Sequence, residues 1–180
     1  MKTNQRIDEA EHRYEKYAVI AVAKWFEQGG YQVGISVPGP LQDILQRADL
    51  GGLEIPAFRE DDLKNPEHRY TVYYDTPGHI DLVARSSSEV WVMEAKGIVK
   101  GGSAPGAVAQ AIGQVVFLMM PREPTLRYAI ILPDEKHFIE VLKSVAPDNP
   151  VLTGDDFRIF LVSKEGSVRC RSLADVLAPS

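Results

Sequence analysis

Residues 78–97 have the pattern of a β-hairpin, and this hairpin constrains the fold more than any other stretch of the chain. Two apolar segments flank a short polar turn, and their apolar residues occur at even and odd positions alike. Strands with that pattern are covered on both faces of a sheet. Three charged residues, Asp81, Glu94 and Lys96, nevertheless lie inside these strands or at their ends.

The predicted pairing of the two strands brings these charges together. A four-residue turn at 86–89 places Asp81 directly opposite Glu94, and opposed residues have Cβ atoms about 5 Å apart. Lys96 lies two residues beyond Glu94 and therefore points to the same face. We expect two carboxylates and an ammonium on one small patch. This expectation depends on the strand register, because a slip of one residue would move the side chains of one strand to the other face of the sheet.

Two acidic side chains in an apolar sheet need a reason to be there. Opposed like charges destabilise a sheet, and an unpaired buried charge costs several kcal/mol. A divalent cation would remove that cost, because hard carboxylate oxygens suit Mg²⁺ or Mn²⁺. The alternative is a salt bridge between Lys96 and one carboxylate at the end of the sheet. The register and the apolar setting favour the metal site.

This arrangement resembles the PD-(D/E)XK nuclease superfamily, which has the restriction-endonuclease-like fold. The resemblance rests on Asp81 followed, one strand later, by Glu94-Ala95-Lys96, and it covers residues 8–132. Ile80 precedes Asp81, at a position where the superfamily has proline in some members only. The resemblance implies an α/β fold with a three-layer core, in which helices flank a central mixed β-sheet.

The resemblance also implies a ligand set for one or two metal ions. Asp81 and Glu94 would bind Mg²⁺ or Mn²⁺ with the main-chain carbonyl of Ala95. Glu15, or else Glu11, would match the acidic residue that the superfamily often supplies from its first helix. From the residues alone, both glutamates line up with the apolar stripe of that helix, where they can also reach solvent from its edge.

The remaining implied roles concern water, phosphate and the following helix. Lys96 would orient or deprotonate the attacking water and stabilise charge on the phosphate. Gln110 and Gln114 share one face of a helix expected at 105–120, among apolar neighbours, so their amides need partners. Gln110 is expected nearer the catalytic end, and Gln114 beside the substrate. The alternative is that the backbone satisfies both amides within the core.

Two further residues are candidates for substrate contacts. His79 shares a strand face with Asp81, and Lys100 lies in a glycine-rich loop that a phosphate backbone can approach closely. An ordinary hydrogen-bonded histidine and a loop without any such role are the alternatives.

The rest of the pattern predicts one domain over residues 1–180, with a small insertion or loop at about 38–69. Glycine, proline and the hydrophobic periodicity define the expected elements. Ser103 and Asp134 are each expected to cap a helix, Trp25 to belong to the apolar stripe of the first helix, and Glu165-Gly166 to form the turn of a terminal hairpin. Helices are expected at 8–28, 41–50, 105–120, 134–145 and 172–177, and strands at 31–37, 70–75, 127–132, 157–163 and 167–171.

Composition limits the protein classes. The formal net charge is −5, with scattered Lys and Arg, so any grip on nucleic acid must be local, depend on a metal ion or be shared with a partner. No apolar run approaches the roughly 20 residues of a membrane helix, and the polar start is unlike a secretory signal. Cys170 is the only cysteine, so a reducing cytoplasm is expected. Because no apolar run is long enough for a membrane helix, no membrane partner is expected.

These observations predict a Mg²⁺-dependent endo- or exonuclease, a hydrolase that cleaves phosphodiester bonds in DNA with metal-activated water. The alternative is a catalytically inactive nuclease-fold protein that serves nucleic-acid binding or protein assembly, which the acidic net charge favours. A third interpretation makes the chain one part of a larger nuclease. A homodimer is one way for a domain of this size to act on both strands.

Overall fold

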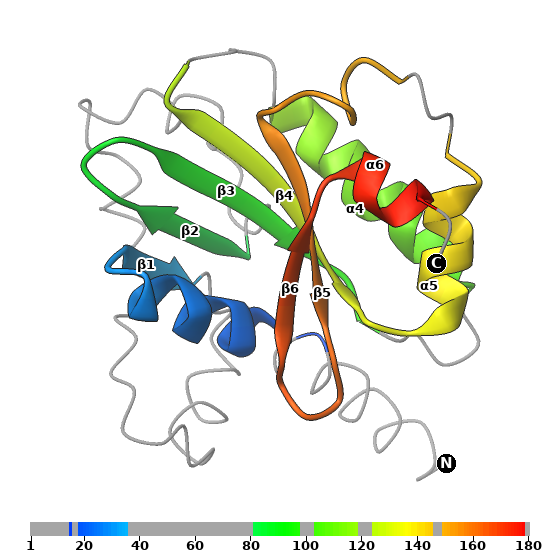
Figure 1. The fold of residues 1–180 in the computed structure, drawn as a ribbon, viewed down its shortest axis with the longest axis horizontal. Coiled ribbons are helices and arrows are strands. Elements are labelled where there is room, and N and C mark those ends of the chain that lie inside the picture. Colours follow the sequence, from blue (N-terminus) through cyan, green and yellow to red (C-terminus); the bar gives the residue numbers. More distant parts are fainter. Residues whose placement is uncertain are drawn as a thin grey trace, which may run out of the picture.

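The computed structural model describes residues 15, 18–35, 81–97, 103–118, 124–145 and 149–178 (Figure 1). Their strands form one six-stranded mixed sheet in the order β1-β2-β3-β4-β5-β6. The pairs β1–β2, β2–β3 and β5–β6 are antiparallel, and β3–β4 and β4–β5 are parallel. The strands are β1 (Gln32–Ile35), β2 (Leu82–Arg85), β3 (Val90–Ala95), β4 (Leu126–Pro133), β5 (Phe157–Val162) and β6 (Val168–Arg171).

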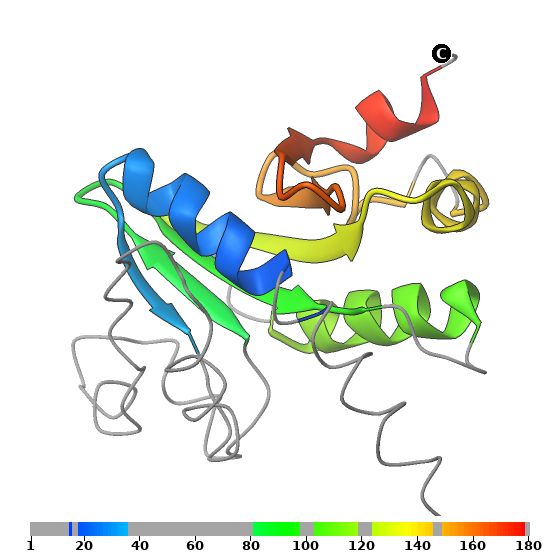
Figure 2. The same cartoon turned by 90° about the horizontal axis from the view of Figure 1, so that it is seen from below.

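Helices pack on both faces of this sheet (Figure 2). One face meets α4 (Ala104–Leu118), α5 (Lys136–Lys143) and α6 (Leu173–Leu177) in a core that includes Val83 and Val92. The other face meets an N-terminal helix, helical over 18–28, in a second core. The fold is therefore α/β, with a mixed sheet between helices, as the sequence predicts at that level.

The central strands carry the longest apolar runs because both of their faces are covered. Every residue of β4 except Arg127 is buried, and so is every residue of β5 except Arg158. Parallel strands have this near-continuous apolar pattern, since crossover helices lie over the sheet on both sides.

The predicted register of the hairpin is confirmed. Leu82 pairs with Met93 and Arg85 pairs with Val90, and the four-residue turn closes with the Ser86 N–H donating to the Glu89 carbonyl at 2.9 Å. Just before β2, the Asp81 N–H donates to the Met93 carbonyl at 3.2 Å. The next position outward therefore sets Asp81 against Glu94.

Other local predictions are confirmed as well. The Ser103 hydroxyl accepts from the Gly106 N–H at 3.3 Å at the start of α4. The terminal hairpin turns at Gly166, whose φ of 84° requires glycine. The last helical turns predicted at 172–177 are α6, capped by Ser172.

Two predictions were wrong where a non-local partner decides the outcome. Asp134 does not cap α5; the N-cap is Glu135, without a side-chain cap bond, and the Asp134 carboxylate binds Arg169 at 2.5 Å instead. Trp25 does not complete the buried stripe of the N-terminal helix: Phe26 is buried, whereas Trp25 is 41% exposed. The spacing of residues along the chain reveals neither the partner of Asp134 on β6, Arg169, nor the angle at which the N-terminal helix packs on the sheet.

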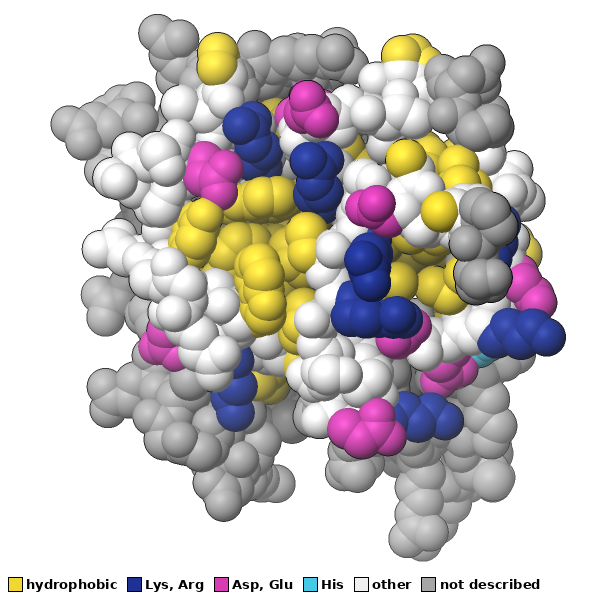
Figure 3. Space-filling model, viewed as in Figure 1, with side chains coloured by type: hydrophobic (Ala, Val, Ile, Leu, Met, Phe, Trp, Pro, Cys, Tyr) yellow, Lys and Arg dark blue, Asp and Glu magenta, His cyan; other side chains and the backbone are white. Residues whose placement is uncertain are grey.

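The face that carries the N-terminal helix shows an apolar hollow and mixed charges (Figure 3). Among the described residues drawn there, Lys and Arg side chains are interspersed with Asp and Glu and form no single basic surface. This agrees with the scattered positive charge of the sequence.

Several predictions lie outside the described residues: the helix at 41–50, the insertion at 38–69, the strand at 70–75, and the roles of Glu11, His79 and Lys100. Among the described helices, none combines the length and apolar character needed to cross a membrane.

Candidate functional site

The three charged residues of the hairpin lie together at the end of β3. Glu94 is the next-to-last residue of β3, Lys96 follows the strand, and Asp81 directly precedes β2. Alternation places Glu94 on the face of Val92, and Asp81 on the face of Val83, which is the face covered by α4. The strand pairing positions them firmly, since the Lys96 N–H continues the ladder to the Ile131 carbonyl at 3.0 Å.

Lys96 makes two short contacts in this site. Its ammonium lies 2.6 Å from Glu94 Oε1 and donates to the Ala95 carbonyl at 2.9 Å. The salt bridge that sequence reasoning kept as an alternative is thus present in the structure. It accounts for one oxygen of Glu94 only.

Asp81 is held by the backbone of the opposite strand. Its Oδ2 accepts from the Ala95 N–H at 2.7 Å. Ala95 therefore presents its N–H to one acidic residue of the site and its carbonyl to Lys96. This main-chain link sets the position of the Asp81 carboxyl relative to β3.

The second oxygen of Glu94 has no hydrogen-bond donor among the described residues. Glu94 is 3% exposed, and Oε2 is buried without a hydrogen bond from any described residue. A buried acceptor left unpaired costs about 1–3 kcal/mol, and more when it is charged. A hard cation is a chemically suitable partner for this oxygen, so the observed donor set fits Mg²⁺ or Mn²⁺.

The two acids have strongly raised pKa values. Burial, the nearby charge of Asp81 and a smaller effect of Glu15 raise the pKa of Glu94 to about 8, against the opposing effect of Lys96. Burial also raises the pKa of Asp81 to about 6 and the charge of Glu15 adds to the effect, although the Ala95 N–H, Lys96 and a hydrogen bond with the Glu94 side chain act to lower it. One ammonium is therefore too little positive charge to keep both carboxyls ionised at neutral pH.

Glu15 reaches the site from the opposite layer. Its Oε2 accepts from the Gly97 N–H at 3.1 Å, which ties the N-terminal helix to the end of β3. No three His, Cys, Asp or Glu side chains of the described residues are grouped so that they could together hold a metal ion. Glu15 is therefore near the site as predicted, but the structure does not join it to Asp81 and Glu94 as a third ligand.

The glutamines of α4 differ from their prediction. The expectation that both lie in a largely buried helix is wrong: Gln110 is exposed, and only Gln114 has a buried amide oxygen, which has no partner among the described residues. The reason is that α4 packs by one face, which includes Ala107, Val108, Ala111 and Val115, whereas Ala109 and Val116 are exposed. Gln114 is thus the more constrained of the two.

Sequence reasoning missed Gly97, whose main-chain N–H joins Glu15 to the site. No side-chain signal could have found it, because the contact uses backbone atoms and a helix 82 residues away in the chain.

Comparisons of the chain with models of protein families, with curated proteins and with solved structures gave no match.

Proposed function

We propose that the protein is a metal-dependent nuclease of the restriction-endonuclease-like fold that hydrolyses phosphodiester bonds in DNA. The observation that carries this proposal is the buried Glu94 Oε2, which has no hydrogen-bond donor among the described residues and lies beside Asp81 and Lys96 at the end of a sheet strand. A structural role would be expected to satisfy that oxygen. A site that receives a cation would leave it open.

The ligands of the proposed site are oxygens. Asp81 and Glu94 would hold Mg²⁺ or Mn²⁺, with the Ala95 carbonyl between them in the chain. Two carboxylates are enough for such a site, because Mg²⁺ is usually bound through one or two carboxylates, waters and the substrate phosphates. A cation bound there supplies a Lewis acid that polarises the scissile phosphate and makes a water more acidic.

The chain's own residues would divide the remaining work. Lys96 carries a positive charge in contact with Glu94, so it would stabilise charge on the phosphate and orient the attacking water. Glu15 would accept the hydrogen bond of the Gly97 N–H and thereby fix the backbone position from which the Lys96 side chain extends. The element order of a helix with Glu15, then β1, β2, β3, α4 and β4, supports the fold assignment.

One observation favours a second candidate, a catalytically inactive protein of the same fold that binds nucleic acid or another protein. Lys96 is already paired with Glu94, as in a purely structural salt bridge, and the net charge of −5 gives no broad phosphate-binding surface.

The deciding experiment offers plasmid, single-stranded, branched and RNA substrates to the protein with Mg²⁺ or Mn²⁺. We expect cleavage of a DNA substrate that needs the metal and is lost in Asp81→Asn and Lys96→Met. Glu140→Gln is the matched control, since it removes an exposed carboxylate on α5 whose partner is the exposed Lys136, 3.6 Å away. Equal cleavage by the site variants, or none by the wild type, would refute catalysis and leave the second candidate.

A further inference from the structure

The ammonium of Lys96 lies against two of the oxygens that the proposed cation would use. Its Nζ is 2.6 Å from Glu94 Oε1 and 2.9 Å from the Ala95 carbonyl oxygen. The side chain is 13% exposed, so it is withdrawn from solvent and directed into the site. The Lys96 ammonium therefore lies where the proposed divalent cation is expected to bind.

We propose that Lys96 is a tethered counter-ion that a divalent cation displaces from Glu94 Oε1 and the Ala95 carbonyl. This inference rests on the metal site of the proposed function and adds a step to it. Without the metal, Lys96 stabilises the two acids. With the metal, its ammonium leaves these oxygens and becomes available to the phosphate and the attacking water.

Simple geometry supports an exchange. Mg²⁺ binds oxygen at about 2.0–2.1 Å in a near-octahedral shell, and an ammonium on the same oxygens would lie within a few ångströms of it. Two cations at that distance repel strongly in a largely buried site. The flexible four-carbon stem of lysine allows its ammonium to move without the backbone.

Hydrogen bonds hold the backbone around Lys96. The Lys96 N–H donates to Ile131 at 3.0 Å, and the Gly97 N–H donates to Glu15 at 3.1 Å. Both bonds anchor the chain on either side of the Lys96 carbonyl. The exchange is therefore a rotation of one side chain about a fixed starting point.

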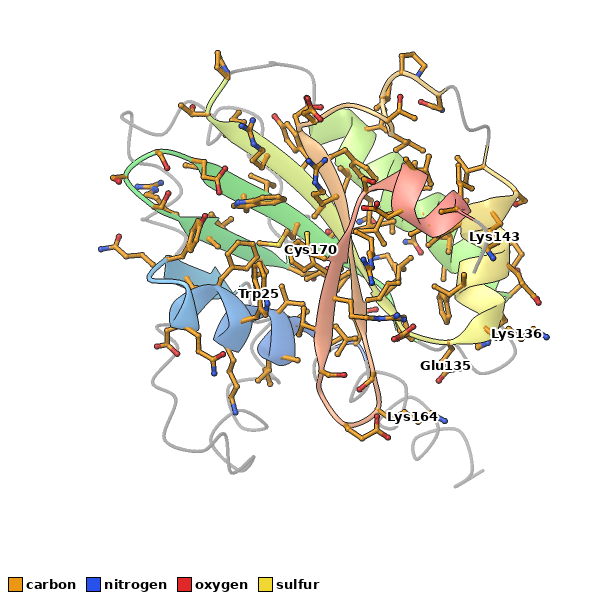
Figure 4. All side chains as sticks on the ribbon, in the orientation of Figure 1. Trp25, Glu135, Lys136, Lys143, Lys164 and Cys170 are labelled. Carbon is orange, nitrogen blue, oxygen red and sulfur yellow. The ribbon has the colours of Figure 1, made fainter. Side chains whose placement is uncertain are left out.

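The first test is a Mn²⁺ titration of the full chain by calorimetry. We expect Lys96→Met to bind Mn²⁺ about tenfold more tightly than the wild type, equivalent to about 1.4 kcal/mol, because no ammonium has to be displaced. Lys164→Met is the matched control: Lys164 is 72% exposed at the β5–β6 turn and its ion-pair partner is Glu135 (Figure 4). That variant should bind Mn²⁺ as the wild type does.

The second test follows the ammonium itself. An amine-acylating reagent and mass spectrometry should find Lys96 modified several-fold faster with saturating Mn²⁺ than without it. Lys136, 89% exposed on α5, is the internal control and should not change. This measurement separates release of the ammonium from simple repulsion, which would tighten binding in Lys96→Met without moving Lys96 in the wild type.

The outcomes distinguish this inference from the function on which it rests. Absence of Mn²⁺ binding to both the wild type and Lys96→Met would overturn the metal site and the exchange together. Binding that is equal or weaker in Lys96→Met, or acylation of Lys96 that Mn²⁺ leaves unchanged, would overturn the exchange alone and leave the metal site standing.

Discussion

The hairpin β2–β3 has a glutamate at each end, the half-buried Glu89 and the buried Glu94, and the two differ in how their carboxylate oxygens are paired. At the turn end, Glu89 Oε1 accepts from the Tyr31 hydroxyl at 2.5 Å and from Trp91 Nε1 at 2.8 Å, while Oε2 lies 3.4 Å from Arg127. At the open end, Glu94 has Lys96 on Oε1, and Oε2 has no hydrogen-bond donor in the part of the chain that the structure describes.

The pKa values follow from these partners. Burial acts to raise the pKa of Glu89, but the hydrogen bonds of Tyr31 and Trp91 and the charge of Arg127 outweigh it, and the net shift is downward. Burial raises the pKa of Glu94 to about 8, and the neighbouring Asp81 adds to the effect. The same residue type on one hairpin is therefore a structural anchor at one end and an under-neutralised acid at the other, which is the condition expected of a cation ligand.

The largest expected difference is in activity. Glu94→Gln should lower metal-dependent DNA cleavage by about 10²-fold or more, a loss typical of removing a group that stabilises transition-state charge. Glu89→Gln should cleave at close to the wild-type rate, assayed well below its unfolding temperature. A large loss of activity in Glu89→Gln, with its fold intact by circular dichroism, would mean that the two ends are not functionally distinct.

For the free energy of unfolding, substitution of Glu89 should have a larger effect than substitution of Glu94. Glu89→Ala leaves the Tyr31 hydroxyl and Trp91 Nε1 without their acceptor, and we expect it to lower the free energy of unfolding by about 2 kcal/mol. Glu94→Met in metal-free protein should cost less than about 1 kcal/mol or stabilise, because it removes a poorly paired buried acid. Urea unfolding at pH 7 measures both, and Tyr31→Phe serves as a control with a smaller loss than Glu89→Ala.

The pH dependence of stability should also differ in sign. The folded-state pKa of Glu94 is about 8, above its unfolded value of 4.5, so the folded protein binds the extra proton and its stability falls as pH rises between these values. Glu94→Gln should flatten that decline, measured by urea unfolding in EDTA from pH 5 to 8.5. The lowered pKa of Glu89 works oppositely: its contribution is present above about pH 4.5 and is lost on acidification.

The smallest expected effect concerns the hydrogen bond from the Gly97 N–H to Glu15, which joins the N-terminal helix to the end of β3. Glu15→Gln keeps an oxygen acceptor for the Gly97 N–H, so cleavage and Mn²⁺ affinity should stay within about threefold of the wild type. Glu15→Ala removes the acceptor and should lower cleavage by about tenfold, consistent with loss of one hydrogen bond of about 1.4 kcal/mol. A Mn²⁺ affinity that falls strongly in Glu15→Gln would instead make Glu15 a direct ligand.

Local sequence determined the hairpin and the placement of its charged residues. A four-residue turn and two apolar strands specify the register, because a slip of one residue would move every side chain to the other face. That register alone sets Asp81 against Glu94, and the alternation of side chains then places Lys96 with them. The capping Ser103 and the turn at Gly166 were likewise predictable, since both act within a few residues of chain.

Only the tertiary structure decided which polar groups are satisfied. Asp134 pairs with Arg169, and Glu15 accepts from the Gly97 N–H. Glu89 pairs with Tyr31 and Arg127 as well as with the nearby Trp91. The distant partners leave no periodic trace in the sequence. The exposure of Gln110 and Trp25 depended on how α4 and the N-terminal helix meet the sheet. Local spacing could therefore bring two acids and a lysine together, but the long-range packing alone left Glu94 Oε2 buried with no hydrogen-bond donor from the described residues.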